Sequence, residues 1–373
     1  MDPFEKRSRV PLVYRIVFEN LRHRRTRTVL SALAIGLGVA MMLSIVGLAE
    51  GMLDDQRDRA RGVGADITIL PPGMSVIGMS SAPMPEKTVE FVSSQPHVAL
   101  ATGVIVQPIK RIDRLTGIDF AQFDRMAHFV FVDGGPFENP FDVILDTFYA
   151  NQKGVKVGDT IELLDREWTV RGIVEPGKMA RVILQKDILQ ELTGATGKIT
   201  TIYVKLDDPA NVGDVIKDLE KKMEGYQVYS VEEIISEFSV TNIPELRTFI
   251  NVIIGVAIGF GFLIIFLTMH TAVLERTREI GILKSLGASA GYILGIFVRE
   301  AFALGVLGTA AGIGASYLVK YAIAAFIPTM QQAIVVSWWP ISLGVTMVGA
   351  LLGVLYPAMK AAKQDALESL SYD

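Results

Sequence analysis

The stretch Leu274-Glu-Arg-Thr-Arg-Glu-Ile-Gly-Ile-Leu-Lys-Ser-Leu-Gly-Ala288 lies between two long hydrophobic runs. At about 100° per residue, its apolar residues fall on one half of a helix. These are Ile280, Ile282, Leu283 and Leu286, with Glu279 among them. Gly287, followed by small residues, is typical of a helix end. Periodicity leaves two interpretations open: a helix lying among lipid headgroups, or a docking surface for another protein.

The runs around this stretch predict membrane spans. The second span covers residues 249–273, with Gly255 and Gly259 spaced as GxxxG. The third covers residues 292–319, and we place its early Arg299-Glu300 pair at the membrane interface because charge inside a span is costly.

A fourth span, residues 338–358, follows a short outer loop at 320–337 and begins with Trp338 and Trp339. Such aromatic pairs are typical of a membrane–water interface. Gly349 and Gly353 are again four residues apart, which favours close helix packing.

The N-terminal part predicts a retained first span. Residues 1–28 are rich in lysine and arginine, and an apolar run at 29–49 follows. This run is longer than the core of a cleaved signal peptide. Small residues recur along it every four positions, a pattern that lets another helix approach closely. They are Ala32, Gly36, Ala40 and Ser44.

No run in residues 50–248 is long enough to span a membrane, which predicts a soluble domain of about 200 residues. Alternating apolar residues at 154–164 and 167–174 predict a β-hairpin, and helices are expected at 86–94, 209–223 and 231–238. The domain is therefore α+β. Residues 73–85 show neither helix nor strand periodicity, and predict either a mobile loop or a contact with an apolar substrate.

Composition agrees with an α-helical membrane protein that has four transmembrane helices and a large α+β extracytoplasmic domain between the first and second. Half of the residues are hydrophobic, only 20% are charged, and mean hydropathy is +0.38. Basic residues flank the spans at 1–28, in the 274–291 loop and in the 359–373 tail, so both termini are expected in the cytoplasm of an inner-membrane protein. The net charge of −4 gives no indication of nucleic-acid binding.

Motifs for catalysis are weak or incomplete. Gly287-Ala-Ser-Ala-Gly291 matches G-x-S-x-G, but it lies between helices and not after a strand. Gly194-Ala-Thr-Gly-Lys198 resembles a P-loop, but Leu192 stands at the first glycine position and Ile199 replaces Ser/Thr. The chain has no cysteine, and its four histidines lack ligand spacing. We therefore expect no metal site, no cofactor and no enzymatic activity in this chain.

Glu275 through Ala288 resembles the E-R-x-x-E-I-G-I-x-K-A-x-G-A signature of FtsX/MacB-type ABC transporter permeases, with Ser285 in place of the usual alanine. Glu300 matches an acidic position common early in the third span of that family. Gly154–Val174 and Leu115–Asp119 are similar to strands of the MacB-like periplasmic core domain. The resemblance covers essentially the whole chain.

The resemblance implies a partner for the opening stretch: a separate ABC ATPase that holds the ATP and Mg²⁺. It implies that closure of the ATPase moves the extracytoplasmic domain, by mechanotransmission through long helices that continue beyond the membrane at 50–61 and 231–248. It also implies a second permease subunit, in a homodimer or a heterodimer. The residues implied in ATPase coupling are Glu275, Arg276, Arg278, Glu279, Ile280, Gly281, Lys284, Leu286 and Gly287.

Three functions follow as hypotheses. The first is export or extraction of a lipoprotein, lipid, peptide or small toxic compound. The second is an FtsX-like regulatory complex that signals to an extracytoplasmic partner such as a cell-wall hydrolase. The third is a membrane receptor without an ATPase. The length of the extracytoplasmic domain, closer to MacB than to FtsX, favours the first.

Overall fold

The computed structural model describes residues 12–23, 25–73, 82–109, 113–239 and 242–363. They divide into two compact units. We call the described residues of 1–49, 245–322 and 332–373 the helical unit, and those of 50–244 and 323–331 the α+β domain. The segment 323–331, far along the chain, therefore belongs to the α+β domain.

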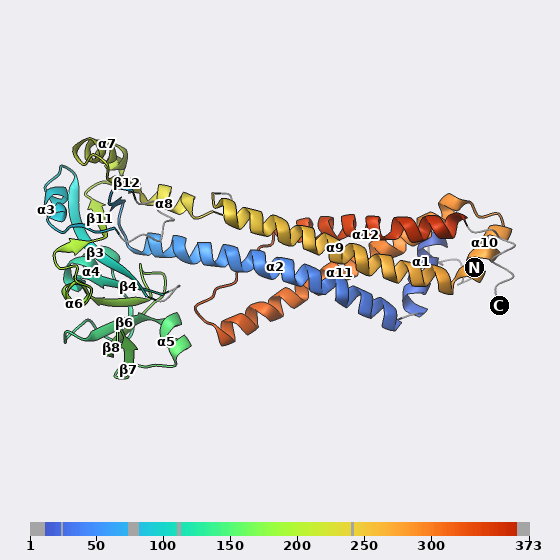
Figure 1. Cartoon of the computed structure of the whole chain (residues 1–373), viewed down its shortest axis with the longest axis horizontal. Helices are drawn as coiled ribbons and strands as arrows, with labels where there is room; N and C mark the ends of the chain where they lie inside the picture. Colours follow the sequence, from blue (N-terminus) through green and yellow to red (C-terminus); the bar gives the residue numbers. More distant parts are fainter. Residues whose placement is uncertain (1–11, 24, 74–81, 110–112, 240–241, 364–373) are drawn as a thin grey trace, which may run out of the picture. The chain divides into compact units, whose positions relative to one another are not determined.

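Six helices supply the helical unit: α1 Leu12–His23, α2 Arg25–Gly62, α9 Pro244–Glu275, α10 Thr277–Ser285, α11 Ala290–Phe326 and α12 Trp338–Lys363. Among the described residues, α2, α9, α11 and α12 are long and apolar enough to cross a membrane. These four run alongside one another in Figure 1. The α1 helix was not anticipated within the basic segment 1–28. Its Val17 is buried and its Leu21 packs against the helical core, four residues further on.

Helix ends differ from the expected boundaries in two places. The third long helix continues to Phe326, so the connection before α12 is residues 327–337 and shorter than predicted. A continuous helix over 231–248 is wrong: α8 (Val231–Glu237) stops and α9 begins only at Pro244. Proline lacks an N–H and its ring clashes with the carbonyl four residues earlier, so it starts a helix more readily than it continues one.

Within its described residues, the α+β domain contains one ten-stranded sheet in the order β12-β1-β11-β3-β4-β9-β6-β8-β5, with β7 paired to β8. The strands are β1 Ile67–Leu70, β3 Val98–Ile109, β4 Asp113–Ile118, β5 Phe131–Gly134, β6 Asp142–Asp146, β7 Thr160–Leu163, β8 Arg166–Val174, β9 Val182–Gln185, β11 Thr201–Leu206 and β12 Gln227–Ser230. A separate pair joins β2 (Met84–Pro85) to β10 (Lys198–Ile199). Most pairs are antiparallel, but β9 runs parallel to β4 and β8 runs parallel to β6.

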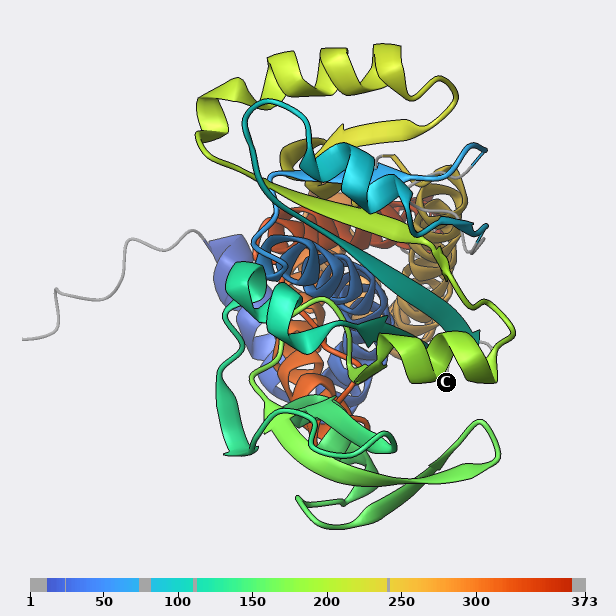
Figure 2. The same cartoon turned by 90° about the vertical axis from the view of Figure 1, so that its left-hand side faces the viewer.

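The long β3 strand, teal in Figure 2, contributes side chains to three cores. Its first part pairs with β11 and its second part with β4. One core packs α3 (Thr88–Ser93) and α7 (Val212–Lys222) on the β11 side. A second core packs α5 (Thr147–Lys153) and α6 (Lys186–Leu192), and a third packs α4 (Phe120–Ala127). Alternate positions of β3 supply different cores, with Ile105 in the second and Val104 and Val106 in the third.

The hairpin predicted at 154–174 is confirmed as β7 and β8. Leu164 and Asp165 form its two-residue loop, with φ of 51° and 56°. Positive φ at both positions is the geometry whose twist matches that of the strands. Trp168 on β8 is fully buried and its indole N–H donates to the Leu163 carbonyl at 2.9 Å.

Candidate functional site

The α10 helix, the centre of the signature stretch, ends as its glycine predicts. Gly287 has φ +92°, and its N–H donates to the Lys284 carbonyl at 2.9 Å. The Ala288 N–H donates to the Leu283 carbonyl, also at 2.9 Å. These two hydrogen bonds form a Schellman motif, which satisfies carbonyls that the end of a helix leaves unpaired. The stop before α11 is therefore fixed by Gly287.

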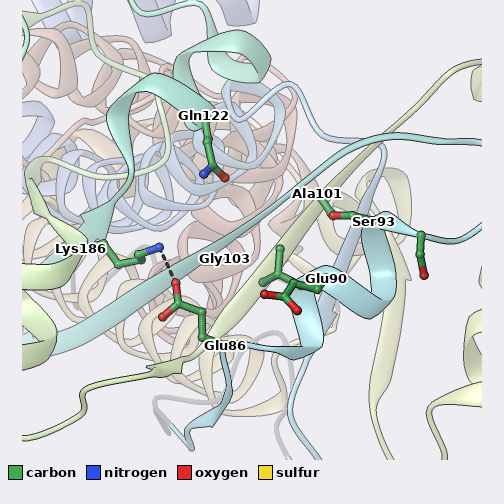
Figure 3. Close-up of a pocket in the computed structure, with 9 residues that line it drawn as sticks. Glu86, Glu90, Ser93, Ala101, Gly103, Gln122 and Lys186 are labelled. Atoms are coloured by element: carbon green, nitrogen blue, oxygen red, sulfur yellow. Dashed lines mark hydrogen bonds and ion pairs between the residues drawn. The ribbon is translucent and has the colours of Figure 1, made fainter.

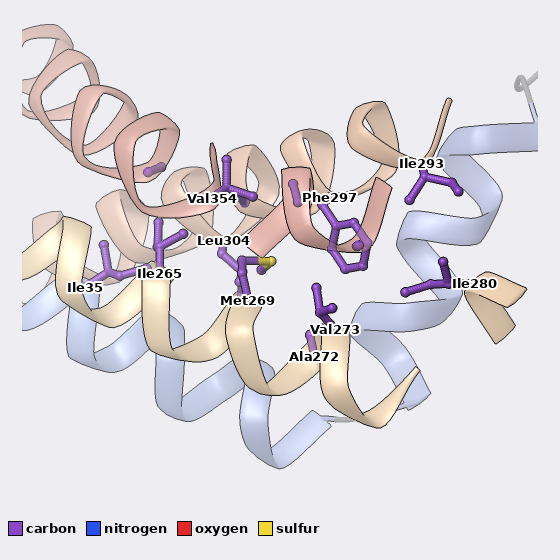
Figure 4. Close-up of a cluster of buried hydrophobic side chains, with 14 residues drawn as sticks. Ile35, Ile265, Met269, Ala272, Val273, Ile280, Ile293, Phe297, Leu304 and Val354 are labelled. Carbon is purple, nitrogen blue, oxygen red and sulfur yellow. The ribbon is translucent and has the colours of Figure 1, made fainter. Parts of the chain in front are cut away.

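One side of α10 packs into the helical unit. Ile280 is 4% exposed and lies in a cluster with Val273, Ile293 and Phe297 from α9 and α11, as Figure 4 shows. Gly281 is buried beside it. The burial of Ile280 fixes how α10 is rotated about its axis, and so which side chains face outward.

The opposite side of α10 is an exposed surface that is partly apolar. Leu286 is 79% exposed and Ile282 is 45% exposed, four residues apart on the same helix face. Arg278 and Glu279 are exposed on the same helix. We call these four residues the α10 surface. Its mixture of large apolar and charged side chains fits the contact surface of a protein better than a continuous lipid face.

A buried ionic network fastens the start of α10. The guanidinium of Arg276 donates to both carboxylate oxygens of Glu300 on α11, at 3.0 and 3.4 Å, and the two side chains are 7% and 2% exposed. Arg27 of α2 donates to Glu275 at 2.9 Å and lies 3.8 Å from Glu300. Two cations and two carboxylates thus balance one another, linking α2, α9, α10 and α11.

The structure divides the residues that the resemblance implies in ATPase coupling. Arg276, Ile280 and Gly281 lie inside the helical unit, where they position α10 and present no surface to a partner. Lys284 is half-buried. The exposed members are Glu275, Arg278, Glu279, Leu286 and Gly287. Sequence reasoning missed Arg27, which it counted only as one of the basic residues before the first span. The signal that was available is Glu300 itself, because a carboxylate within an apolar run needs a positive charge beside it.

The predicted helix-packing residues also divide into two groups, those that are buried or contact another helix and those that contact none. A Cβ on Gly36 would lie 3.0 Å from the Gly308 carbonyl of α11, and one on Gly353 would lie 2.6 Å from the Phe262 carbonyl of α9. Gly349 approaches α9 similarly, and Ala32 and Ala40 are buried. The Ser44 hydroxyl is buried and finds no hydrogen-bond partner among the described residues. Gly255 and Gly259 have no described neighbour within 4 Å of a built Cβ.

The α+β domain has a polar cavity of about 570 Å³ over β3, shown in Figure 3. Ala101 and Gly103 form its floor, and Glu86, Glu90 and Lys186 stand around it. Burial raises the pKa of Glu86, but hydrogen bonds from Lys186 and Gln190 and the charge of Lys186 outweigh it, so the pKa is lowered. Glu86 is therefore an ionised partner of Lys186.

Other motifs take ordinary structural roles. The Ser289 hydroxyl accepts from the Tyr292 N–H at the start of α11, so the serine of the G-x-S-x-G match caps a helix. Gly194 and Gly197 of the P-loop lookalike lie in the turns between α6 and β10. The described residues hold no group of three histidines or carboxylates that could bind a metal ion. Residues 74–81 of the 73–85 loop lie outside the described residues.

Comparison with known proteins gives two family matches. Residues 251–366 match the FtsX-like permease C-terminal model, and residues 28–222 match the MacB-like periplasmic core domain. An ABC transporter permease of Methanocaldococcus jannaschii, MJ1507, is 25% identical over 98% of this chain and 99% of its own length. The YknZ permease of Bacillus subtilis is 36% identical over 43% of this chain and 40% of its own length.

The macrolide export ATP-binding/permease protein MacB of Escherichia coli K12 is 23% identical over 94% of this chain, which spans 59% of that relative's length. Among solved structures, the periplasmic region of MacB from Actinobacillus actinomycetemcomitans covers 47% of this chain and 92% of that chain, at 15% identity and a TM-score of 0.37.

The apolar helices, the inserted α+β domain and both family matches define a multi-pass membrane protein of the ABC transporter class. The chain belongs to the FtsX/MacB-type ABC transporter permeases.

Proposed function

We propose that this permease receives a separate ABC ATPase on the α10 surface, and that movement of the ATPase is carried through the helices to the α+β domain. ATP and Mg²⁺ are held by the ATPase, because this sequence has an incomplete P-loop. The moving domain acts on a molecule outside the membrane, of the lipoprotein, lipid, peptide or small toxic compound class. This is mechanotransmission: the energy of ATP becomes movement of a domain on the far side.

The observation that carries this proposal is the pairing of the α10 surface with the buried network behind it. Ile282 and Leu286 offer apolar contact area on one side of α10. Arg276 and Glu300 fix the start of α10 to α11, and Arg27 extends the link to α2. A force applied to α10 is therefore delivered to two long helices and is not absorbed by a flexible loop.

Two of the connections into the α+β domain, α2 and the chain between α8 and α9, differ in stiffness. The α2 helix runs without interruption from Arg25 to Gly62, so it enters the domain as one helix. In the other connection, α8 ends at Glu237 and a separate helix, α9, begins at Pro244. Backbone hydrogen bonds make a helix stiff along its axis, whereas an interrupted segment bends at the break. We assign transmission chiefly to α2.

The orientation follows the charges. In the proposed orientation, the basic residues that flank the spans lie in the cytoplasm. Both termini and α10 are then cytoplasmic, and the α+β domain lies outside an inner membrane. Each chain acts with a second permease subunit. The E. coli relative is named as both ATP-binding protein and permease, and this chain spans 59% of its length. That supports an ATPase that works together with this permease.

The test places an acid on the α10 surface. Ile282→Asp with Leu286→Asp should abolish co-purification of the ATPase, because apolar contact area becomes charged. Reversal of charge at Arg278 and Lys284 should weaken it. Val132→Asp is the matched control, since Val132 is 60% exposed on β5. Retention of the ATPase and of its activity by both α10 variants would overturn the docking assignment.

The alternative function, regulation of an extracytoplasmic enzyme, predicts a different result in membranes that contain the permease and its ATPase. A permease that signals to an extracytoplasmic enzyme would capture that enzyme through its α+β domain in an ATP-dependent way. A permease that moves a molecule would instead release labelled substrate on addition of ATP, with no enzyme bound.

A further inference from the structure

A second buried ionic cluster lies in the α+β domain, around Arg181 just before β9. We call it the Arg181 cluster. It draws side chains from the end of α2, from β6 and α5, and from the segment between α11 and α12. Its members are Asp55, Arg59, Asp146, Phe148, Gln152, Arg181 and Thr329.

Arg181 joins α2 to the segment between α11 and α12. Its Nη2 donates both to the Asp55 carboxylate of α2 and to the Thr329 carbonyl, each at 2.9 Å. Arg59, one helical turn beyond Asp55, donates to the same carboxylate oxygen at 2.8 Å. The side chains of Arg181 and Asp55 are 14% and 10% exposed. Water therefore competes little for these hydrogen bonds.

The other side of the guanidinium faces the sheet. Arg181 Nη1 lies 3.8 Å from the Asp146 carboxylate, and the guanidinium carbon lies 5.7 Å from the centre of the Phe148 ring. Asp146 is fixed in turn, because it accepts from the Tyr149 N–H at the start of α5. The Thr329 hydroxyl donates to Gln152 of α5. Thr329 is thus held to the domain through both its carbonyl and its hydroxyl.

The same connecting segment is also fixed within the helical unit, four residues later. The Ala333 N–H donates to the Gly47 carbonyl of α2 at 2.8 Å. A Cβ on Gly47 would lie 2.4 Å from the Ala333 carbonyl, so the approach needs glycine there. Gln332, between the two attachments, is 6% exposed. The connection from α11 to α12 is therefore held by hydrogen bonds at both Thr329 and Ala333. We call this connection, residues 327–337, the strap.

We propose that Arg181 is the positioning residue that makes the α+β domain follow α2 and the α11–α12 strap as one body. The proposal rests on the proposed function and adds to it a site of transmission. Asp55 moves with α2, of which it is part, and Thr329 moves with the strap. The Arg181 guanidinium bonds both, and Arg181 directly precedes strand β9 of the domain.

The choice of arginine fits this role. A planar guanidinium offers several donors in fixed directions and can bond a carboxylate and a carbonyl together, whereas a lysine ammonium is a point charge on a flexible stem. Burial lowers the pKa of Arg181, an effect that Arg59 increases, and burial raises the pKa of Asp146. Such charges are costly to bury, and similar arrangements specify one geometry more than they add stability.

The first experiment uses the whole chain in lipid nanodiscs and follows amide hydrogen exchange in residues 327–333. Arg181→Gln should accelerate exchange there by about tenfold, because the strap loses its attachment. Arg181→Lys keeps the positive charge but lacks the planar guanidinium with its several donors. Exchange in Arg181→Lys should therefore be as fast as in Arg181→Gln. Arg171→Gln is the matched control, since Arg171 lies on β8 of the same sheet and pairs with Glu138. Unchanged exchange in Arg181→Gln would overturn the proposal.

The second experiment measures transmission. The natural chain has no cysteine, so spin labels at Lys217→Cys and Tyr321→Cys report one distance between the α+β domain and α11. In nanodiscs with the co-expressed ATPase, ATP should change this distance in the otherwise unaltered chain, and Arg181→Gln should lose at least about half of the change. An equal change in Arg181→Gln would refute the role of Arg181.

The two proposals fail in different ways. If ATP changes no distance even with Arg181 present, the mechanotransmission proposal fails, while the exchange result still decides whether Arg181 holds the strap. If Arg181→Gln instead lowers binding of the ATPase to α10, Arg181 acts on assembly and the transmission role is wrong. Thermal unfolding of the α+β domain should match that of Arg171→Gln, which separates lost transmission from lost folding.

Discussion

Arg276 and Arg181 are both buried arginines that pair with a carboxylate near an arginine of α2, but their surroundings differ. Arg276 donates to both oxygens of Glu300, at 3.0 and 3.4 Å. Arg181 uses Nη2 for both of its hydrogen bonds, and its buried Nη1 has no hydrogen-bond partner among the described residues. Arg276 thus bonds both oxygens of one carboxylate, whereas Arg181 leaves one of its nitrogens without a hydrogen bond among the described residues.

This difference assigns a different mechanical property to each cluster. A bidentate arginine–carboxylate pair has one preferred geometry, so the Arg276 pair holds α10 and α11 together rigidly. Arg181 leaves a buried donor without a hydrogen bond among the described residues, which costs free energy. The Arg181 cluster is therefore expected to add less stability than the Arg276 pair, although it joins more segments of the chain.

Breaking the rigid cluster should give the largest loss of stability. Glu300→Ala leaves Arg276 buried without a counter-charge and should cost about 3–5 kcal/mol. Thermal unfolding in detergent measures it, with Glu279→Ala, an exposed carboxylate on α10, as the control. The pair of changes Arg276→Met and Glu300→Leu should recover much of the loss. A single Glu300→Ala variant as stable as the control would contradict the proposed rigidity.

The contact between α9 and α12 should show the next largest effect. Gly353→Ala places a Cβ 2.6 Å from the Phe262 carbonyl and should cost about 1–3 kcal/mol through overpacking. Gly259→Ala meets open space and should be neutral or slightly stabilising, because alanine favours helix. Thermal unfolding of the two variants decides this. Equal losses would mean that the contact between α9 and α12 tolerates a wider separation.

The Arg181 cluster should show a smaller effect that depends on pH. Burial raises the pKa of Asp146 above its ordinary value of 3.8. Folding therefore favours the protonated carboxyl, and the ionised form destabilises the fold as pH rises from about 4 through the raised pKa. Asp146→Asn removes this loss while keeping an acceptor for Tyr149. The variant should gain relative stability from pH 4 to pH 7 in parallel unfolding scans, and a constant difference would contradict the sign.

The smallest effect on stability is expected at the α10 surface. Leu286→Ser replaces a side chain that is 79% exposed, so stability should change by less than about 0.5 kcal/mol. Binding of the ATPase should nevertheless fall. Joint measurement of unfolding and co-purification tests the contrast, because a large loss of stability would show that Leu286 packs against something in the membrane.

Local sequence signals predicted the elements that depend on nearby residues. The helix stop at Gly287 and the turn after β7 follow from backbone conformations that few residues adopt easily. The helices α4, α5 and α6 were missed because seven or eight residues give only two turns of periodicity. The aspartates that cap α4 and α5, Asp119 and Asp146, were usable signals.

The buried clusters needed the three-dimensional fold. The sequence analysis placed Glu300 at the membrane interface because of its charge, and nothing local showed that Arg27 and Arg276 lie beside it. Arg181 and Thr329 are 148 positions apart, and Arg181 and Asp55 are 126 apart. Without aligned relatives, nothing in one sequence selects that arginine among the many exposed ones.

The uninterrupted α2 helix also sets a scale for the permease. Its 38 residues correspond to a rod of about 57 Å. Arg27 and Asp55 are about 42 Å apart along it, so a tilt of about 5° about Arg27 displaces Asp55 by about 4 Å. That displacement exceeds the length of any hydrogen bond in the Arg181 cluster. If the Arg181 cluster stays bonded to Asp55, as proposed, a tilt of α2 by a few degrees is therefore enough to move the residues of the domain that contact Asp55.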